Sequence, residues 1–210
     1  MKKRSGFDRM SPFAYPFYIL LHPRDGFQEL KFNKKGSALI TFGLVLLWLL
    51  TEVFYQSFAD FDFNPSQRAD LLILVFSTVG AFFAVTVANW CFCTLMDGKG
   101  SYGEICTVCS YALLPYLLVR NLTTLLSRVM TLDEGILLSY SVILSLIWSF
   151  FLLFSGLQEI HEYTEGKTVG SLLLTVVGVL IILFILLLLA TVFQQLSVFV
   201  RTVFLELTAR

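Results

Sequence analysis

Five long apolar segments follow one another in this sequence and constrain its fold more than any other feature. They lie at about 38–58, 71–96, 110–127, 136–157 and 169–193. Each is roughly 20 residues long, the length that an α-helix needs to cross the hydrocarbon core of a bilayer. A soluble chain of this size could not hide five such segments in one core. The sequence therefore predicts an all-α, polytopic membrane protein built as a bundle of five transmembrane helices.

The composition agrees with a lipid environment. Hydrophobic residues make up 57% of the 210 residues and charged residues 14%, compared with about 45–50% and about 25% in soluble domains. The formal net charge is zero, which argues against nucleic acid as a partner because no overall positive field would attract it. The lipid bilayer is therefore the first partner that the sequence predicts.

Basic residues are concentrated before the first apolar segment. Eight of the fifteen lie there: Lys2, Lys3, Arg4, Arg9, Arg24, Lys31, Lys34 and Lys35. The positive-inside rule then places the N-terminus in the cytoplasm, and five crossings place the C-terminus outside the cell membrane. No short apolar region with a cleavage site precedes the first span. We therefore expect that span to act as an uncleaved signal anchor.

Two parts are expected along the chain. Residues 1–36 should form a cytoplasmic basic leader and an interfacial helix, because residues 12–21 are rich in aromatic side chains and Pro23 suits a first helical position. Residues 37–210 should form the five-helix transmembrane domain. In its last stretch, 194–210, apolar residues recur at helical spacing beside polar ones. We expect this C-terminal amphipathic helix extension to lie on the outer surface or to pack against a partner.

A polar, glycine-marked turn separates the second and third spans. It begins with DGKGSYG at residue 97 and lacks the Lys-Ser/Thr pair of a phosphate-binding loop. We therefore interpret it as a cytoplasmic hairpin and not as a nucleotide site. The residues expected to form the hairpin or to contact a partner there are Gly98, Lys99, Gly100, Tyr102, Tyr111 and Pro115.

Four polar residues lie within the predicted spans: Glu52 in the first, Asn89 in the second, and Arg120 and Asn121 in the third. An unpaired charge inside the bilayer costs at least about 2.5–3.5 kcal/mol, so a partner is expected. Counted from the cytoplasmic ends of their spans, Glu52 and Arg120 lie roughly 21 and 15 Å deep, within reach of a long side chain. Either the two residues pair and fix the first span to the third, or each reaches the outer interface independently.

The four cysteines do not predict a metal site or a disulfide. Cys91, Cys93, Cys106 and Cys109 bracket the hairpin. Residues 91 and 93 would point about 200° apart on a helix, and cytoplasmic thiols rarely form structural disulfides. We expect these cysteines to behave as small apolar side chains.

The segment 156–168, GLQEIHEYTEGKT, contains Glu159, His161, Glu162 and Glu165. One histidine among carboxylates is a weak metal-ligand set, so we interpret this segment as a solvated inner loop. Motifs for a phosphate-binding loop, a nucleophile elbow, a zinc protease and a dinucleotide fold are absent from the sequence. The sequence therefore predicts a protein without a cofactor and without enzymatic activity.

Three stretches resemble the Yip-domain family of small polytopic membrane proteins in its bacterial form. They are LHPRDGFQELKFNKKGS before the first span, DGKGSYGEICTVCSYALLPY at the hairpin, and WSFFLLFSGLQEIHEYTEGKT, which covers the end of the fourth span and the segment after it. Residues 111–115, YALLP, look like the Tyr-x-Leu-x-Pro element of that family. The likeness extends from about residue 21 to the fifth span.

The resemblance implies five helices, a cytoplasmic N-terminus and a protein that acts by binding other integral membrane proteins. Bacterial members are similar to proteins encoded beside carbohydrate ABC importers, which implies an accessory subunit that binds ABC importer permease subunits. The acidic Asp-Leu-Tyr-Gly-Pro element of eukaryotic members is absent here. This absence argues against their GTPase-binding role in vesicle trafficking.

The sequence thus favours a membrane scaffold or accessory subunit. Small residues such as Gly43, Ala81, Ala84 and Ala88 permit close contacts between helices. The alternative is a small permease or ion pathway, for which Glu52, Asn89, Arg120 and Asn121 are the candidate polar groups. Such a pathway often shows inverted repeats, and none is visible in the sequence.

Overall fold

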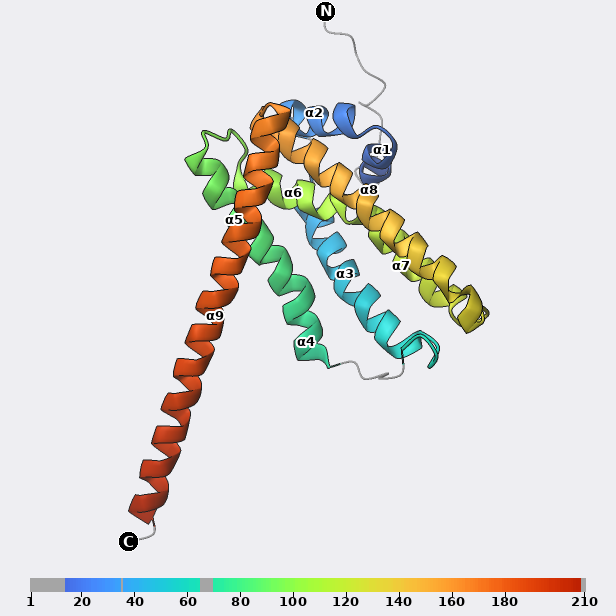
Figure 1. Ribbon diagram of the computed structural model, residues 1–210. Helices are drawn as coiled ribbons and strands as arrows, with labels where there is room; N and C mark the ends of the chain where they lie inside the picture. The colour runs from blue at the N-terminus through green and yellow to red at the C-terminus, as the bar shows by residue number, and fades with distance from the viewer. Residues whose placement is uncertain (1–13, 35, 65–69, 209–210) are drawn as a thin grey trace, which may run out of the picture.

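The computed structural model describes residues 14–34, 36–64 and 70–208. The first residues of the predicted basic leader, and Lys35, lie outside the described residues. Within the described part all regular elements are helical (Figure 1). They are α1 (Tyr15–Leu21), α2 (Pro23–Asn33), α3 (Ala38–Phe58), α4 (Leu71–Val75), the π-helical η3 (Phe76–Gly80), α5 (Ala81–Leu95), α6 (Tyr102–Ala112), α7 (Leu114–Leu126), the 3-10 turn η4 (Leu132–Glu134), α8 (Gly135–His161) and α9 (Glu165–Thr208).

Five helical stretches are long and apolar enough to cross a membrane, as predicted. They are Ala38–Phe58, Leu71–Leu95, Tyr102–Leu126, Gly135–His161 and Glu165–Glu206. The second consists of α4, η3 and α5, and the third consists of α6 and α7. The protein is therefore an all-α, multi-pass membrane protein, which confirms the predicted fold class.

The third span begins earlier than the predicted residue 110. Its first helix, α6, starts at Tyr102, where the Ser101 side chain and the Glu104 side chain form a capping box. The span then changes from α6 to α7 at Leu113, with Pro115 in the first turn of α7. Proline has no N–H to donate and its ring clashes with the preceding turn, which explains why one helix ends there and another begins.

The inner loop predicted at 156–168 is mostly helical, so that prediction is wrong. Helix α8 continues to His161 and α9 begins at Glu165. The chain reverses at Glu162, whose φ of 57° is left-handed. Only a three-residue turn joins the two helices, because the apolar residues Leu157 and Ile160 pack in the core and hold the last turn of α8 in helical form.

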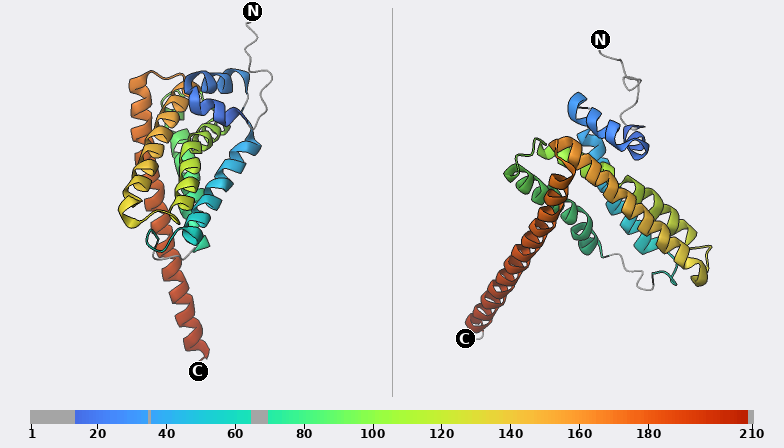
Figure 2. Two further views of the ribbon diagram at one scale, coloured as in Figure 1. Left: turned by 90° about the vertical axis from the view of Figure 1, so that its right-hand side faces the viewer. Right: turned by 45° about the horizontal axis from the view of Figure 1, so that its top comes forward.

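The last helix also differs from the prediction. Helix α9 is one continuous helix of 44 residues, and it leaves the other helices as a straight rod toward the C-terminus (Figures 1 and 2). The predicted amphipathic extension is helical, but it continues in line with the fifth span and does not turn along a surface.

The core lies at the end of the bundle where the hairpin and the α8–α9 turn meet, which we call the inner end. Helices α1 and α2 cover this end (Figure 2), and α2 packs on α8 and α6. Ile19 and Phe27 of these helices are fully buried in one cluster with Ile105, Leu152 and Ile160 of the spans. The two N-terminal helices thus share a core with the membrane helices.

Candidate functional site

The hairpin after α5 is clamped onto the α8–α9 turn. Gly98 and Gly100 lie against the imidazole of His161, which is 2% exposed. A Cβ at Gly98 would lie 2.5 Å from His161 Nδ1 and 2.8 Å from the Cys93 carbonyl oxygen. The Gly100 N–H donates to His161 Nδ1 at 3.3 Å. Glycine is needed here because any side chain would push the hairpin off the imidazole.

The Tyr163 ring also contributes to this contact between the hairpin and the α8–α9 turn, which we call the His161 clamp. The His161 imidazole stacks on Tyr163 with ring centroids 5.1 Å apart, and the Tyr163 hydroxyl donates to the Cys93 carbonyl oxygen at 3.1 Å. The interpretation of His161 as a residue of a solvated loop is therefore wrong. Its burial depends on segments distant in the sequence, so no local signal in residues 156–168 could have revealed it.

Lys31 joins helix α2 to this clamp. Its Nζ donates to the carbonyl oxygens of Ile160 at 2.7 Å and of Lys99 at 3.0 Å. The Ile160 carbonyl is near the C-terminal end of α8, where backbone oxygens have no helical partner and a cation is favourable. Lys31 Nζ also lies 3.9 Å from the Glu104 carboxylate. One lysine thus links α2, the hairpin, α6 and α8.

The hairpin residues that were expected to contact a partner differ in exposure. Lys99 points outward and pairs with Glu162, and this hydrogen bond lowers the pKa of the Glu162 carboxyl. The Tyr102 hydroxyl lies 3.3 Å from Thr86 Oγ1. Tyr111, at 1% exposed, packs edge-on against Tyr15, and Pro115 is buried. Direct contact of Tyr111 or Pro115 with a partner is not compatible with this burial, so that expectation is corrected: both position α6 and α7 from within.

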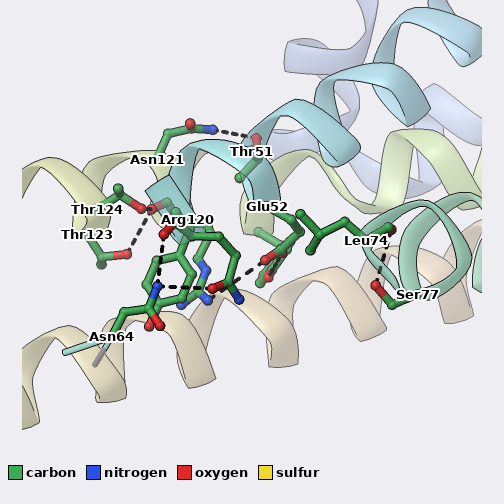
Figure 3. A network of polar contacts seen from close by, with 12 residues as sticks. Thr51, Glu52, Asn64, Leu74, Ser77, Arg120, Asn121, Thr123 and Thr124 are labelled. Atoms are coloured by element: carbon green, nitrogen blue, oxygen red, sulfur yellow. Dashed lines mark hydrogen bonds and ion pairs between the residues drawn. The ribbon is translucent and has the colours of Figure 1, made fainter. Parts of the chain in front are cut away.

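The intramembrane charges form a network between α3 and α7 (Figure 3). Arg120 Nη2 lies 3.9 Å from Glu52 Oε2, and the guanidinium lies 3.5 Å from the ring centroid of Tyr55. The Tyr116 hydroxyl donates to the other oxygen of Glu52. Of the two alternatives left by the sequence, the structure has the paired one, because both charges point toward one another between the two helices.

Asn121 adds a neutral contact to the same helix pair. Its Nδ2 donates to Thr51 Oγ1 at 2.8 Å, and Thr51 is 1% exposed. Thr51 and Tyr116 were not among the predicted residues, although the sequence contains a signal for them. Thr51 adjoins Glu52 in the chain, and Tyr116 precedes Arg120 by one helical turn.

Asn89 belongs to a different contact, between α5 and α9. Its Nδ2 donates to Thr175 Oγ1 at 3.0 Å, and Cys93 Sγ lies 3.0 Å from Ser171 Oγ. Ser171 and Thr175 are four residues apart and so share one face of α9. Ser171 and Thr175 were not predicted as contacts, although a pair of small polar residues four apart in an apolar helix is a sequence signal for such a face.

None of the four cysteines is in a disulfide, and their environments differ. Cys93 and Cys109 are buried, Cys106 is partly buried and Cys91 is exposed. Within residues 14–34, 36–64 and 70–208, no three His, Cys, Asp or Glu side chains are grouped closely enough to hold a metal ion.

Helix α9 packs on α5 and α8 near its beginning, and its distal part has no neighbour among the described residues. Thr168, Ser171, Thr175 and Gly178 are buried against the bundle, but from Leu183 to Glu206 every side chain is exposed. Most of these side chains are large and apolar. The helix therefore presents a long apolar surface that none of the residues described by the structure covers.

Comparisons with known proteins complete this picture. A family model described as the Yip1 domain matches residues 17–200. The match extends from α1 to the exposed part of α9 and so includes the clamp and both polar contacts. Searches of curated proteins and of solved structures find no match.

Proposed function

Because the chain belongs to the Yip1 domain family of membrane proteins, we propose that it is a non-enzymatic scaffold or accessory subunit that binds another integral membrane protein through α9. The orientation that we propose has the inner end and the N-terminus in the cytoplasm and the C-terminus outside the cell membrane. The basic residues before α3 support this orientation through the positive-inside rule.

The uncovered surface of α9 is the observation that carries the proposal. The helix has 44 residues, which corresponds to roughly 66 Å at 1.5 Å per residue, about twice the 30 Å hydrocarbon core. At the tilts of about 0–40° found for membrane helices, a helix of this length extends beyond the hydrocarbon core, so lipid tails cannot cover all of its apolar surface. Phe199 and Phe204 are 65% and 67% exposed. Exposed apolar surface of this kind is typical of an interaction site.

The partner that we propose to test first is the permease of a carbohydrate ABC importer, which the family resemblance implies. The geometry supports a helical membrane partner because α9 offers a straight apolar face both in the bilayer and beyond it. A helix of such a partner could pack along α9 without rearrangement of the core at the inner end.

Site-specific photocrosslinking in cells tests this proposal. A photoreactive amino acid at Leu187 or Phe199 is expected to capture a membrane protein. The same probe at Ile147, which is exposed on α8 and 61% accessible, serves as the matched control and is expected to give only lipid adducts. Recovery of the protein as a monomer after mild extraction, with no protein adduct at either α9 position, would contradict the proposal.

The alternative, a small permease or ion pathway, has less support from the geometry. Glu52 and Asn121 bind side chains between α3 and α7, and Asn89 binds α9. These polar groups are used to hold neighbouring helices together. Solute flux through reconstituted protein that Arg120→Ala abolishes would favour the permease.

A further inference from the structure

A groove opens between α3 and α5 at the inner end, next to the hairpin. Its volume is about 710 Å³. Lys31, Lys34 and Lys99 line it at the level of the hairpin, while Phe42, Leu46 and Phe83 line it farther into the membrane. The groove thus has a cationic mouth at the membrane surface and an apolar wall that continues toward the bilayer interior.

The charge at the mouth favours an anion. Three lysines and one carboxylate, Glu104, line the groove. Lys31 lies beside Glu104 and Lys99 pairs with Glu162 outside the groove, so the positive charge in excess is that of Lys34. Glu104 is already occupied, because it accepts a hydrogen bond from the Ser101 N–H at 2.8 Å and lies 3.9 Å from Lys31. Lys34 is exposed and has no ion pair or hydrogen bond to any described residue. Its ammonium is therefore free to bind a ligand.

The apolar wall shows that the ligand is more than a soluble anion. Val45 and Phe82 form the buried floor, and Phe42 and Phe83 remain 69% and 52% exposed at the sides. Leu46, which also lines the groove, lies roughly 12 Å along α3 from the inner end of that helix at Ala38, which is within one leaflet of a core about 30 Å thick. An acyl chain would cover this wall, whereas inorganic phosphate would leave it exposed.

We propose that this groove binds one anionic phospholipid of the leaflet at the inner end. The phosphate binds the ammonium of Lys34 at the mouth, and an acyl chain lies along the wall between α3 and α5. Basic pockets between transmembrane helices bind anionic headgroups in this manner, and a lysine near the surface contributes about 1 kcal/mol. The site does not depend on the partner proposed for α9, because the groove is on other helices.

Native mass spectrometry of the full chain, delipidated in mild detergent, tests the charge. Added dioleoylphosphatidylglycerol is expected to leave one lipid bound per protein, with clear preference over dioleoylphosphatidylcholine. Lys34→Gln should weaken phosphatidylglycerol binding about fivefold. Lys167→Gln, at the same end but outside the groove, should leave it unchanged. Equal binding of the two lipids, or no effect of Lys34→Gln, would overturn the proposal.

A second pair of variants tests the wall. Leu46 lines the groove and is 44% exposed, whereas its neighbour Leu47 does not line it and is 41% exposed. Leu46→Trp is expected to reduce lipid retention, and Leu47→Trp is expected to leave it as in the wild type. Glycerol phosphate is the probe for a soluble anion. If it competes with the lipid at equal concentration, or if both Trp variants retain lipid equally, the groove is not a phospholipid site.

Discussion

The inner end of the molecule and the distal part of α9 are built from similar apolar residues but pack in opposite ways. At the inner end, α1, α2, α6 and the end of α8 bury Phe27, Ile105 and Ile160 completely. Along α9 from Leu183 to Glu206, every side chain is exposed. The two regions show that high hydropathy alone does not tell which segments hold the fold together. Five spans have the length to cross a bilayer, but the fifth has only 11% of its most apolar window buried.

This difference in packing predicts that the inner end determines the stability of the protein and that distal α9 determines its interactions. Helix–helix contacts in membranes depend on close packing and on hydrogen bonds between helices, because lipid tails are as apolar as the side chains. The inner end has both kinds of contact, whereas distal α9 has neither within the described residues. Substitutions at the inner end should therefore change the stability of the isolated protein, and substitutions on distal α9 should change only its assembly.

The largest effect is expected for Phe27→Ala in α2. Phe27 is 0% exposed and lies against Gly156 of α8, so the substitution leaves a cavity in the shared core and should cost about 3–5 kcal/mol. Thermal unfolding in detergent would measure this. The matched control is Phe32→Ala on the same helix, where the side chain is 70% exposed and the change should be within about 0.5 kcal/mol. Equal behaviour of the two variants would show that α2 is not part of the core.

A somewhat smaller loss is expected for Gly98→Ala at the hairpin clamp. The added methyl would meet the His161 ring and the Cys93 carbonyl oxygen, and overpacking of this kind costs about 1–3 kcal/mol. The control is Gly166→Ala in the first turn of α9, where a Cβ meets nothing within 4 Å. Protease accessibility of the hairpin provides the measurement. If Gly98→Ala leaves the hairpin as protected as in the wild type, the clamp does not hold it.

The contact between the intramembrane charges Glu52 and Arg120 should make a modest contribution to the stability of the protein. A double-mutant cycle with Glu52→Gln and Arg120→Gln is expected to give a coupling of about 0.6–1.7 kcal/mol, between the average and the maximum found for polar contacts between membrane helices. Replacing Arg120→Gln in the cycle by Arg128→Gln provides the control, since Arg128 contacts Phe58 and not Glu52. A coupling near zero in both cycles would mean that the two charges are solvated independently.

The sequence was sufficient to predict the five spans because hydropathy is a local property. It misplaced the start of the third span because that span is the most buried, with 56% of its window inside the protein and a hydropathy of only 1.4. Thr107 and Ser110 of α6 are buried within the protein, so they can be polar. The Glu52–Arg120 pair was one of the two arrangements that depth along the spans allowed, and the structure has this one. The His161 clamp could not be predicted, since its neighbours come from the hairpin and from α2.

The smallest effect on stability is expected on distal α9, where Phe199→Ala combined with Phe204→Ala removes two exposed rings. Because no described residue packs on them, the thermal stability of the purified protein should change by less than about 0.5 kcal/mol. Aromatic side chains often dominate binding energy at interfaces, so recovery of the crosslinked partner should fall at least about tenfold, or about 1.4 kcal/mol. Phe151→Ala, on the exposed face of α8, should change neither quantity. A loss of stability comparable to that of Phe27→Ala would instead mean that distal α9 packs on its own bundle in the membrane, and the contrast between the two regions would disappear.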